Sequence, residues 1–392
     1  MDCKFMSLKE LSNGCGMYGI AASAVDYNPT LPTYLRITDI DDYGNIIKEN
    51  LKSVTSPNIS KYMLSENDVV FARTGNSTGR FYVYDKRDGD YAFAGFLIKF
   101  NLNTDLINPK YLKYYLLSKE YRGWVTSNIT GSTRGNINAK QFGEMIIPVP
   151  PKHIQDSIVD IIQIIDDKIR YNHKINANLI KLKQTLFKNL LSRFDEEECV
   201  TLSSVATLQK QTWKPSNSME ILEHYSIPAF DEKQFPVFDE SATVHSNKTI
   251  VTSDCILISK LNPETKRVWR PICITDKAVC STEFLAIMPI DKEFDQYIYS
   301  IIDSDEYTEY LINNATGSTG SRQRVLPDTA MQFKFPWPKP SDIASYSGLS
   351  RTIEEKIKEL QLEKQKLIEL RDYLLPKLMS GEIDVSQLDL AD

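Results

Sequence analysis

Two stretches of the chain space their apolar side chains at steps of three and four residues, the spacing that puts them on one face of an α-helix. Each stretch runs for roughly 40 residues and therefore predicts a helix of about 60 Å. The apolar positions of the first stretch are Ile154, Ile158, Ile161, Ile165, Ile175, Leu179, Leu182, Leu186 and Leu190. Those of the second are Leu349, Ile353, Ile357, Leu360, Leu367, Leu370, Leu374 and Leu378.

A long helix with a single narrow apolar stripe needs a matching stripe to cover it. Each stretch supplies that match for the other, so we expect the two helices to pair within one chain as an antiparallel coiled coil. Lys168 and Asn172 interrupt the first stripe, and polar groups at such positions could fix the register. A homodimeric coiled coil is the competing arrangement. The expected seam positions are Ile158, Ile165, Asn172, Leu179, Leu186, Ile353, Leu360, Leu367 and Leu374.

The regions that precede the two stretches carry short apolar runs separated by glycine, asparagine and proline, a pattern typical of strands joined by turns. In the first region the runs predict strands at Tyr34–Thr38, Val69–Ala72, Phe81–Tyr84 and Ala94–Phe100. One helix, Pro109–Trp124, is expected to follow them, because proline is favoured in a first helical turn.

The chain repeats itself with a period near 187 residues. Thr130-Gly-Ser-Thr-Arg134 recurs as Thr316-Gly-Ser-Thr-Gly320, and Ile147-Pro-Val-Pro150 recurs as Phe335-Pro-Trp-Pro338. A tandem duplication predicts a mixed α/β (α+β) protein with two similar domains, separated by two long paired helices related by a pseudo-twofold. The expected segments are a first mixed domain at 1–150, a central helix at 151–193, a second mixed domain at 194–338, and a C-terminal helix and tail at 339–392.

Composition is that of an ordinary globular protein, with 42% hydrophobic and 25% charged residues in 392. No apolar run approaches the roughly 18 residues that span a bilayer, and the start carries no secretory signal. The six cysteines form no C-x-x-C pair, and the four histidines lie far apart. We therefore expect reduced thiols in a cytoplasmic protein and no metal site.

The net charge of −6 is unevenly distributed: the four segments carry +2, +4, −9 and −3 in chain order. This charge balance argues against a protein that coats nucleic acid without sequence preference. It allows a protein that recognises nucleic acid through local basic loops. The sequence contains no P-loop, no H-E-x-x-H and no G-x-G-x-x-G that opens a helix after a strand. The carboxylate pair Asp166-Asp167 is expected on a solvated helix face. No catalytic residue is therefore predicted.

Two loops in each mixed region combine small residues with arginine, hydroxyl and amide groups. Such groups suit phosphates and base edges, since arginine can bind phosphate or guanine and asparagine can bind adenine. We expect Trp213 and Trp269 to pack in the core. The candidate binding residues of the first region are Arg73, Asn76, Ser77, Thr78, Arg80, Ser132, Thr133, Arg134 and Asn136. Those of the second are Lys260, Lys266, Arg267, Arg270, Ser318, Thr319, Ser321, Arg322 and Arg324.

The duplicated layout resembles the specificity (S) subunit of type I restriction–modification systems. So do Leu35-Arg-Ile-Thr-Asp-Ile40, the Gly-Ser-Thr loops that lead into Ile147-Pro-Val-Pro-Pro151, Asp167-Lys-Ile-Arg-Tyr-Asn-His-Lys-Ile-Asn176, and Leu370-Arg-Asp-Tyr-Leu-Leu-Pro-Lys-Leu-Met-Ser-Gly-Glu-Ile383. The resemblance covers essentially the whole chain.

By this resemblance, each mixed region is a target recognition domain that reads one half of a split site in double-stranded DNA. The helices hold the readers apart and dock two modification (methyltransferase) subunits, and restriction (endonuclease/translocase) subunits complete the nuclease. The resemblance implies a non-catalytic chain without cofactors, with S-adenosylmethionine, ATP and Mg²⁺ on the partner subunits and no role for a membrane. A scaffold for protein assembly, with the same coiled coil and no DNA readout, is the alternative.

Overall fold

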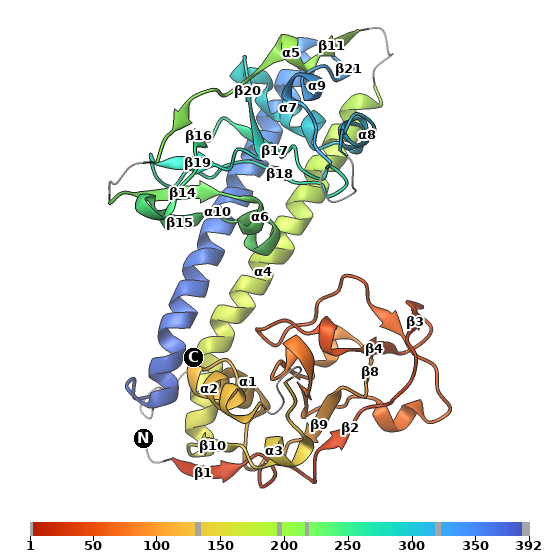
Figure 1. Cartoon of the computed structure of the whole chain (residues 1–392), viewed down its shortest axis with the longest axis vertical. Coiled ribbons are helices and arrows are strands. Elements are labelled where there is room, and N and C mark those ends of the chain that lie inside the picture. Colours follow the sequence, from red (N-terminus) through yellow and green to blue (C-terminus); the bar gives the residue numbers. More distant parts are fainter. Residues whose placement is uncertain (1–2, 130–134, 194–197, 216–218, 318–322, 386–392) are drawn as a thin grey trace. The chain divides into compact units, whose positions relative to one another are not determined.

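The structure, a computed structural model, describes residues 3–129, 135–193, 198–215, 219–317 and 323–385 (Figure 1). The chain divides into two compact units. Unit 1 contains Met1–Arg170 and Gln365–Asp392, and unit 2 contains Tyr171–Lys364. Each unit thus combines one mixed domain with a part of each long helix.

Unit 1 has an inner sheet, an outer sheet and a separate strand pair. The pair joins β1 (Lys4–Ser7) to β10 (Ile146–Val149) in antiparallel register. The inner sheet has the order β2 (Met17–Tyr18), β9 (Leu97–Asn101), β6 (Asp68–Ala72) and β7 (Phe81–Val83). The outer sheet has the order β3 (Val25–Asp26), β5 (Lys52–Ser53), β4 (Thr33–Leu35) and β8 (Tyr91–Phe93). β4 and β8 run parallel.

The helical part of unit 1 differs from the prediction at one point. The expected helix Pro109–Trp124 is two helices, α1 (Pro109–Tyr115) and α2 (Lys119–Asn128). Ser118 separates them, because its hydroxyl accepts a hydrogen bond from the Tyr121 amide at 3.2 Å and so starts a new helix. A third helix, α3 (Ala139–Gly143), precedes β10.

Unit 2 repeats this arrangement with longer outer strands. The strand pair is β11 (Cys199–Thr201) with β21 (Lys334–Pro336). The inner sheet has the order β12 (Ala206–Leu208), β20 (Phe284–Pro289), β17 (Ile256–Ser259) and β18 (Val268–Trp269). The outer sheet has the order β13 (Thr212–Trp213), β16 (Lys248–Ile250), β19 (Ala278–Cys280), β14 (Ile221–Tyr225) and β15 (Val237–Glu240). The helices are α5 (Leu202–Val205), α6 (Ile227–Lys233), α7 (Asp295–Ile302), α8 (Asp305–Asn313) and α9 (Pro327–Ala330).

The inner halves of the two units follow the same plan. Both inner sheets have the same strand order, and in each a buried tyrosine bonds to the last strand of its domain. The Tyr111 hydroxyl donates to the Pro148 carbonyl at 2.9 Å, and the Tyr297 hydroxyl donates to the Pro336 carbonyl at 2.6 Å. The outer sheets differ, since β5 pairs with β4 in unit 1 whereas β16 pairs with β19 in unit 2. The duplication is thus clear in the inner sheets and altered in the outer ones.

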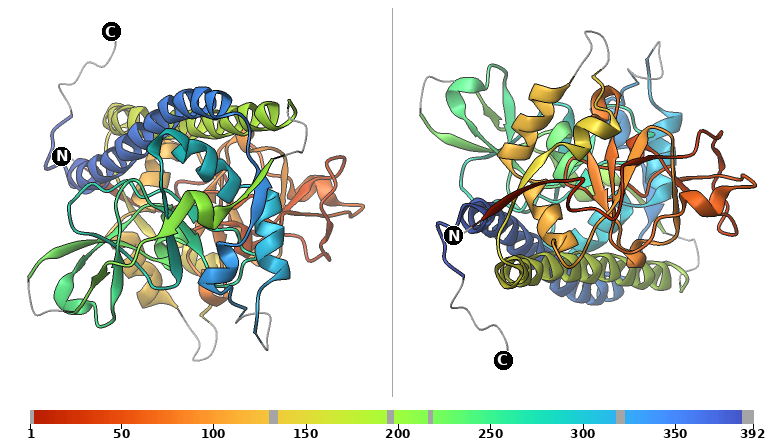
Figure 2. Two further views of the ribbon diagram at one scale, coloured as in Figure 1. Left: turned by 90° about the horizontal axis from the view of Figure 1, so that it is seen from above. Right: turned by 90° about the horizontal axis from the view of Figure 1, so that it is seen from below.

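The two long helices are α4 (Lys152–Leu191) and α10 (Pro340–Ser380), and they pack against each other (Figure 2). In unit 1 the start of α4 packs on the end of α10, where Ile158 and Ile162 share a core with Leu375 and Leu378. In unit 2 the end of α4 lies beside the first part of α10, where Lys183 meets Glu354 at 2.6 Å. The helices are therefore antiparallel in both units, and the predicted fold class and pairing within one chain are confirmed.

The predicted stripe was wrong at four positions. Ile175, Leu182, Leu349 and Leu370 are 44%, 47%, 59% and 45% exposed. Regular steps of three and four continue past the width of the seam, because an α-helix turns slightly less per residue than a strict heptad requires. Of the expected seam residues, Ile158, Ile165, Asn172 and Leu360 are buried, and Leu179, Leu186, Ile353, Leu367 and Leu374 are partly buried.

Candidate nucleic-acid interface

The first candidate loop, Arg73–Arg80, follows inner strand β6 and is held tightly to the second one. Its backbone turns at Gly75 and Gly79, both with positive φ, which glycine adopts without strain. The Thr78 hydroxyl lies 2.7 Å from the Gly75 carbonyl and 3.1 Å from the Gly135 carbonyl. The structure therefore brings the two predicted loops of unit 1 together.

Arg73 lies at the junction of these loops. Its Nε donates to the Asn136 side chain at 3.3 Å, and its guanidinium lies 4.9 Å from the centre of the Tyr18 ring. Neither partner is an acid, so the positive charge of Arg73 is not cancelled by a carboxylate among the contacts of this side chain. Asn76, at the tip of the first loop, is exposed. Among the predicted binding residues of unit 1, Arg73, Asn76 and Asn136 together provide a cationic and amide surface.

The other described candidates of unit 1 have structural contacts. Arg80 bonds to the Asp42 carboxylate at 2.7 Å and to the Ile40 carbonyl at 3.0 Å, so its charge is paired. Ser77 is 8% exposed. Ser132, Thr133 and Arg134 lie outside the described residues, as do Ser318, Thr319, Ser321 and Arg322 of unit 2.

Most of the candidate cations of unit 2 are paired with carboxylates. Lys266 meets Asp303 at 3.3 Å. Arg267 bonds to both oxygens of Asp231, at 2.6 and 2.9 Å. Arg324 meets Glu283 at 3.0 Å. The predicted loop 259–270 is therefore close to electrically neutral, although its lysine and arginine content suggested a basic surface. Lys260 has no such pair among the described residues.

Arg270 is part of a buried charge network that joins the mixed domain to α10 within unit 2. It bonds to Asp295, which also accepts from Arg351 at 2.8 Å. Burial raises the pKa of the Asp295 carboxyl, but the guanidinium groups of Arg270 and Arg351 outweigh that effect and the pKa lies below its ordinary value. The arrangement stabilises the ionised acid between two cations. Arg270 thus has a structural role here.

Three interactions that sequence reasoning missed lie along the helix pair. In unit 1, Asp166 accepts from Arg371 at 3.3 Å and from the Tyr114 hydroxyl at 3.0 Å. The expectation of a solvated Asp166 was therefore wrong. In unit 2, the Asn172 side chain donates to Glu363 at 2.7 Å. The sequence did show that Asn172 interrupts an apolar stripe, but it did not show that Glu363 is its partner.

The two tryptophans differ in their burial. Trp269 is 5% exposed and packs against Tyr225 with ring centres 4.7 Å apart, as expected for a core residue. Trp213 is only partly buried and rests on a small cluster of Leu222, Val244 and Val279. One side of its indole ring is therefore held by the protein while another part remains accessible.

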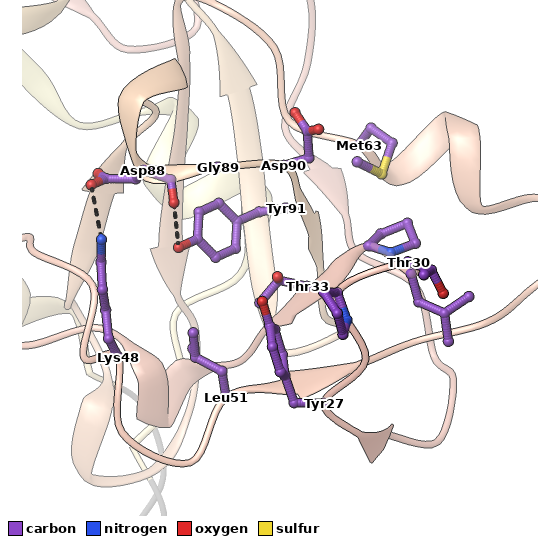
Figure 3. Close-up of a pocket in the computed structure, with 13 residues that line it drawn as sticks. Tyr27, Thr30, Thr33, Lys48, Leu51, Met63, Asp88, Gly89, Asp90 and Tyr91 are labelled. Atoms are coloured by element: carbon purple, nitrogen blue, oxygen red, sulfur yellow. Dashed lines mark hydrogen bonds and ion pairs between the residues drawn. The ribbon is translucent and has the colours of Figure 1, made fainter.

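A pocket of about 520 Å³ lies against the outer sheet of unit 1 (Figure 3). Tyr27, Lys48, Asp88 and Tyr91 contribute its polar groups. The Lys48 ammonium lies 3.9 Å from Asp88, and the Tyr91 hydroxyl donates to the Asp88 carbonyl at 3.2 Å. Lys48 and Tyr91 thus both engage Asp88, and none of the predicted binding residues lines the pocket. Within the described parts of the chain, no three His, Cys, Asp or Glu side chains cluster as metal ligands, and no helix is long and apolar enough to cross a bilayer.

Comparison with known proteins confirms the resemblance. Residues 4–181 match the family described as "Type I restriction modification DNA specificity domain". The chain is 21% identical over 409 residues to the type I restriction enzyme HindI specificity subunit of Haemophilus influenzae, across 83% of this chain and 89% of that protein. It is 24% identical over 310 residues to the MjaIX specificity subunit of Methanocaldococcus jannaschii, across 72% of this chain and 71% of that protein.

A solved structure supports the same fold. The type I restriction–modification S subunit from M. genitalium superposes with a TM-score of 0.55 at 17% identity, and the match covers 96% of both chains. At this level of identity the likeness concerns the fold, which extends over nearly the whole length of both proteins.

Proposed function

Residues 4–181 match the family described as "Type I restriction modification DNA specificity domain", and on that premise we propose that the chain is the DNA-recognition subunit of a type I restriction–modification complex. Each mixed domain reads one half of a bipartite site in double-stranded DNA. The observation that carries the proposal is the repeated inner sheet: strand order β2-β9-β6-β7 recurs as β12-β20-β17-β18. Two domains with one plan and different outer sheets suit two readers with different targets.

In this proposal the paired helices set the gap between the half-sites. Half-sites that face the same side of B-DNA are about one helical turn, or about 34 Å, apart. The partly buried contacts Asp166–Arg371 and Lys183–Glu354 hold α4 against α10 in each unit. DNA in the unread gap would contribute through its shape and flexibility.

The helices also dock two modification subunits. In unit 2, α4 exposes Tyr171, Ile175 and Leu182, which are 54%, 44% and 47% exposed. Steps of four and seven residues put them on one side of the helix, away from the buried seam residues Asn172 and Lys183. Contiguous exposed apolar side chains on a helix are a suitable surface for a protein partner. The partners supply S-adenosylmethionine, methyl transfer and, in the nuclease, ATP-dependent restriction, and this chain is non-catalytic.

The test is an exchange of residues 1–150 for the same region of a relative, followed by mapping of methylated adenines in host DNA. The expected result is a change in one half-site, with the other half-site and the gap unchanged. The reciprocal exchange of residues 194–338 is the matched control and should change the other half-site. Modular reading would be contradicted if a single exchange changed both half-sites. It would also be contradicted if neither exchange changed any half-site.

A scaffold for protein assembly is the second candidate function. The carboxylate pairs of Lys266 and Arg267 favour it, because they leave loop 259–270 with little free positive charge. A gel shift with the chain and its modification subunits separates the two functions. A scaffold would support the complex without binding DNA.

A further inference from the structure

In unit 2 a different surface from the predicted loops carries free positive charge. Residues 205–219 and 241–253 contain Lys210, Lys214 and Lys248 and no aspartate or glutamate, although residues 194–338 as a whole have a net charge of −9. The structure pairs these two acid-free segments with each other, since β13 and β16 are antiparallel neighbours and Trp213 is opposite Lys248. We call this surface the β13–β16 edge.

The lysines of the β13–β16 edge lack carboxylate partners in the part of the chain that the structure describes. Lys210 and Lys214 are exposed, and the Lys248 ammonium donates to the Ser246 hydroxyl at 2.9 Å. In the predicted loop, by contrast, Lys266 and Arg267 are each paired with an acid. A cation already paired with a carboxylate gains less from a phosphate than one that is paired only with water or a hydroxyl.

Acidic side chains of the outer sheet lie at its opposite edge. Strand order places β13 at one edge and β15, with Asp239 and Glu240, at the other. Asp239 is also engaged by the His224 ring at 2.8 Å. The sheet is therefore polarised, with free cations along one edge and carboxylates along the other, which is the charge distribution expected when only one edge meets a polyanion.

The β13–β16 edge is also rigid. The Gln209 side chain accepts from the amides of Lys210 and Gln211 at 2.9 and 3.1 Å, and this fixes the turn that leads into β13. The Ile250 amide donates to the Gln211 carbonyl at 2.9 Å. Trp213 rests on a buried cluster, so its accessible part is presented in one position. A preorganised edge loses little entropy when a ligand binds.

We propose that the β13–β16 edge is the DNA-contacting surface of the second recognition domain, with Lys210, Lys214 and Lys248 on phosphates and Trp213 against deoxyribose or thymine methyl groups. This inference rests on the proposed function and moves the contact from loop 259–270 to the outer sheet. The exposed amide side chains of Gln211 and Asn247 flank the lysines and supply donors and acceptors for base edges.

The experiment compares DNA binding by the full chain, purified with its modification subunits, across a salt titration with fluorescein-labelled double-stranded DNA. The test variant is Lys210→Gln/Lys214→Gln/Lys248→Gln. Its matched control is Lys233→Gln/Lys334→Gln/Lys339→Gln, which removes three exposed lysines from other parts of unit 2. For the test variant, the slope of log K against log salt concentration should become shallower by about 0.9 for each phosphate contact removed. The variant should also bind DNA at least about tenfold more weakly. The control should keep the wild-type slope.

Trp213→Phe gives an independent readout. DNA should quench part of the tryptophan fluorescence of the wild-type complex, and this part should be absent in Trp213→Phe, whose smaller ring still fills the cluster. The β13–β16 proposal would be overturned if the triple variant kept the wild-type affinity and salt slope and Trp213→Phe kept the wild-type quenching. The proposal that the chain recognises DNA would still stand in that case. Failure of both the wild-type and the control complex to bind DNA would overturn the proposed function as well.

Discussion

Asp166 and Arg371 form a salt bridge of 3.3 Å across the helix pair of unit 1, and its repeat-related counterpart is the 2.6 Å bridge between Glu354 and Lys183 in unit 2. In both cases the acid lies in the earlier part of its helix and the base in the later part of the other. The duplication has therefore preserved a contact between helices along with their apolar pattern. Lys183 is the more deeply buried of the two bases, and its ammonium also lies 4.0 Å from the centre of the Tyr299 ring.

We predict that Lys183→Met lowers the free energy of unfolding by about 2–4 kcal/mol, because it leaves Glu354 partly buried without its cation. Lys183→Arg should recover most of that loss, since the guanidinium can serve both the carboxylate and the ring. Lys181→Met, at an exposed position of the same helix, is the control and should change stability by less than about 0.5 kcal/mol. Equal melting temperatures for Lys183→Met and Lys181→Met would contradict the assigned role of the salt bridge.

For the Asn172–Glu363 pair, we predict that a single substitution destabilises the chain and that a double substitution restores its stability. Asn172 is 1% exposed, and its Oδ1 has no partner in the described structure. Asn172→Leu alone should destabilise the chain by about 1–3 kcal/mol, because the hydrogen bond from Asn172 to Glu363 is lost. Asn172→Leu/Glu363→Leu should be at least as stable as the wild type, as with other replacements of buried polar pairs by apolar ones. Thermal unfolding of the three proteins checks this, and a double variant less stable than Asn172→Leu would refute it.

Asp295 predicts a defined pH dependence of stability. Since its pKa in the folded chain lies below the ordinary value, the carboxylate stabilises the fold above about pH 4, and the stabilisation is lost as pH falls through the lowered pKa. Asp295→Asn should therefore cost about 2–4 kcal/mol at pH 7. The difference between wild type and variant should shrink below about pH 4. Denaturant titrations at several pH values measure it, and a difference that stays constant into that acid range would be inconsistent with the ionised Asp295.

Two glycines provide a matched test of close packing. A Cβ at Gly19 would lie 2.2 Å from the Ala94 carbonyl oxygen, whereas one at Gly123 in α2 would meet nothing within 4 Å. Gly19→Ala should lower stability by more than about 2 kcal/mol, because backbone rather than a flexible side chain must move. Gly123→Ala should raise stability by about 0.5–1 kcal/mol, since alanine favours the helix. The reverse order of melting temperatures would contradict the packing of Gly19 on Ala94.

The helices could be predicted because their signal is local and periodic. Steps of three and four residues gave α4 and α10 nearly to their ends, and the repeat gave the equivalence of the two domains. The break between α1 and α2 was missed, although Ser118 is a recognisable helix start. The prediction of one helix over Pro109–Trp124 gave more weight to the apolar spacing than to Ser118 as a capping residue.

The candidate interface could be predicted less well, because the state of a cation depends on residues far away in the sequence. Arg80 is paired with Asp42, and Arg324 with Glu283, across about 40 positions each. Residue types in a loop show which contacts are possible but not which are already used. A better signal was the absence of acids, since residues 205–219 and 241–253 carry lysines without any aspartate or glutamate.

The order of strands in the outer sheets has a practical consequence for engineering. In each unit the parallel strands of the outer sheet come from segments separated by inner strands, as with β14 and β19, between which the chain forms β17 and β18. No single continuous peptide can therefore be transplanted to carry one reading surface into another protein. The smallest graft that keeps its backbone hydrogen bonds is a complete domain, cut where it joins the long helices.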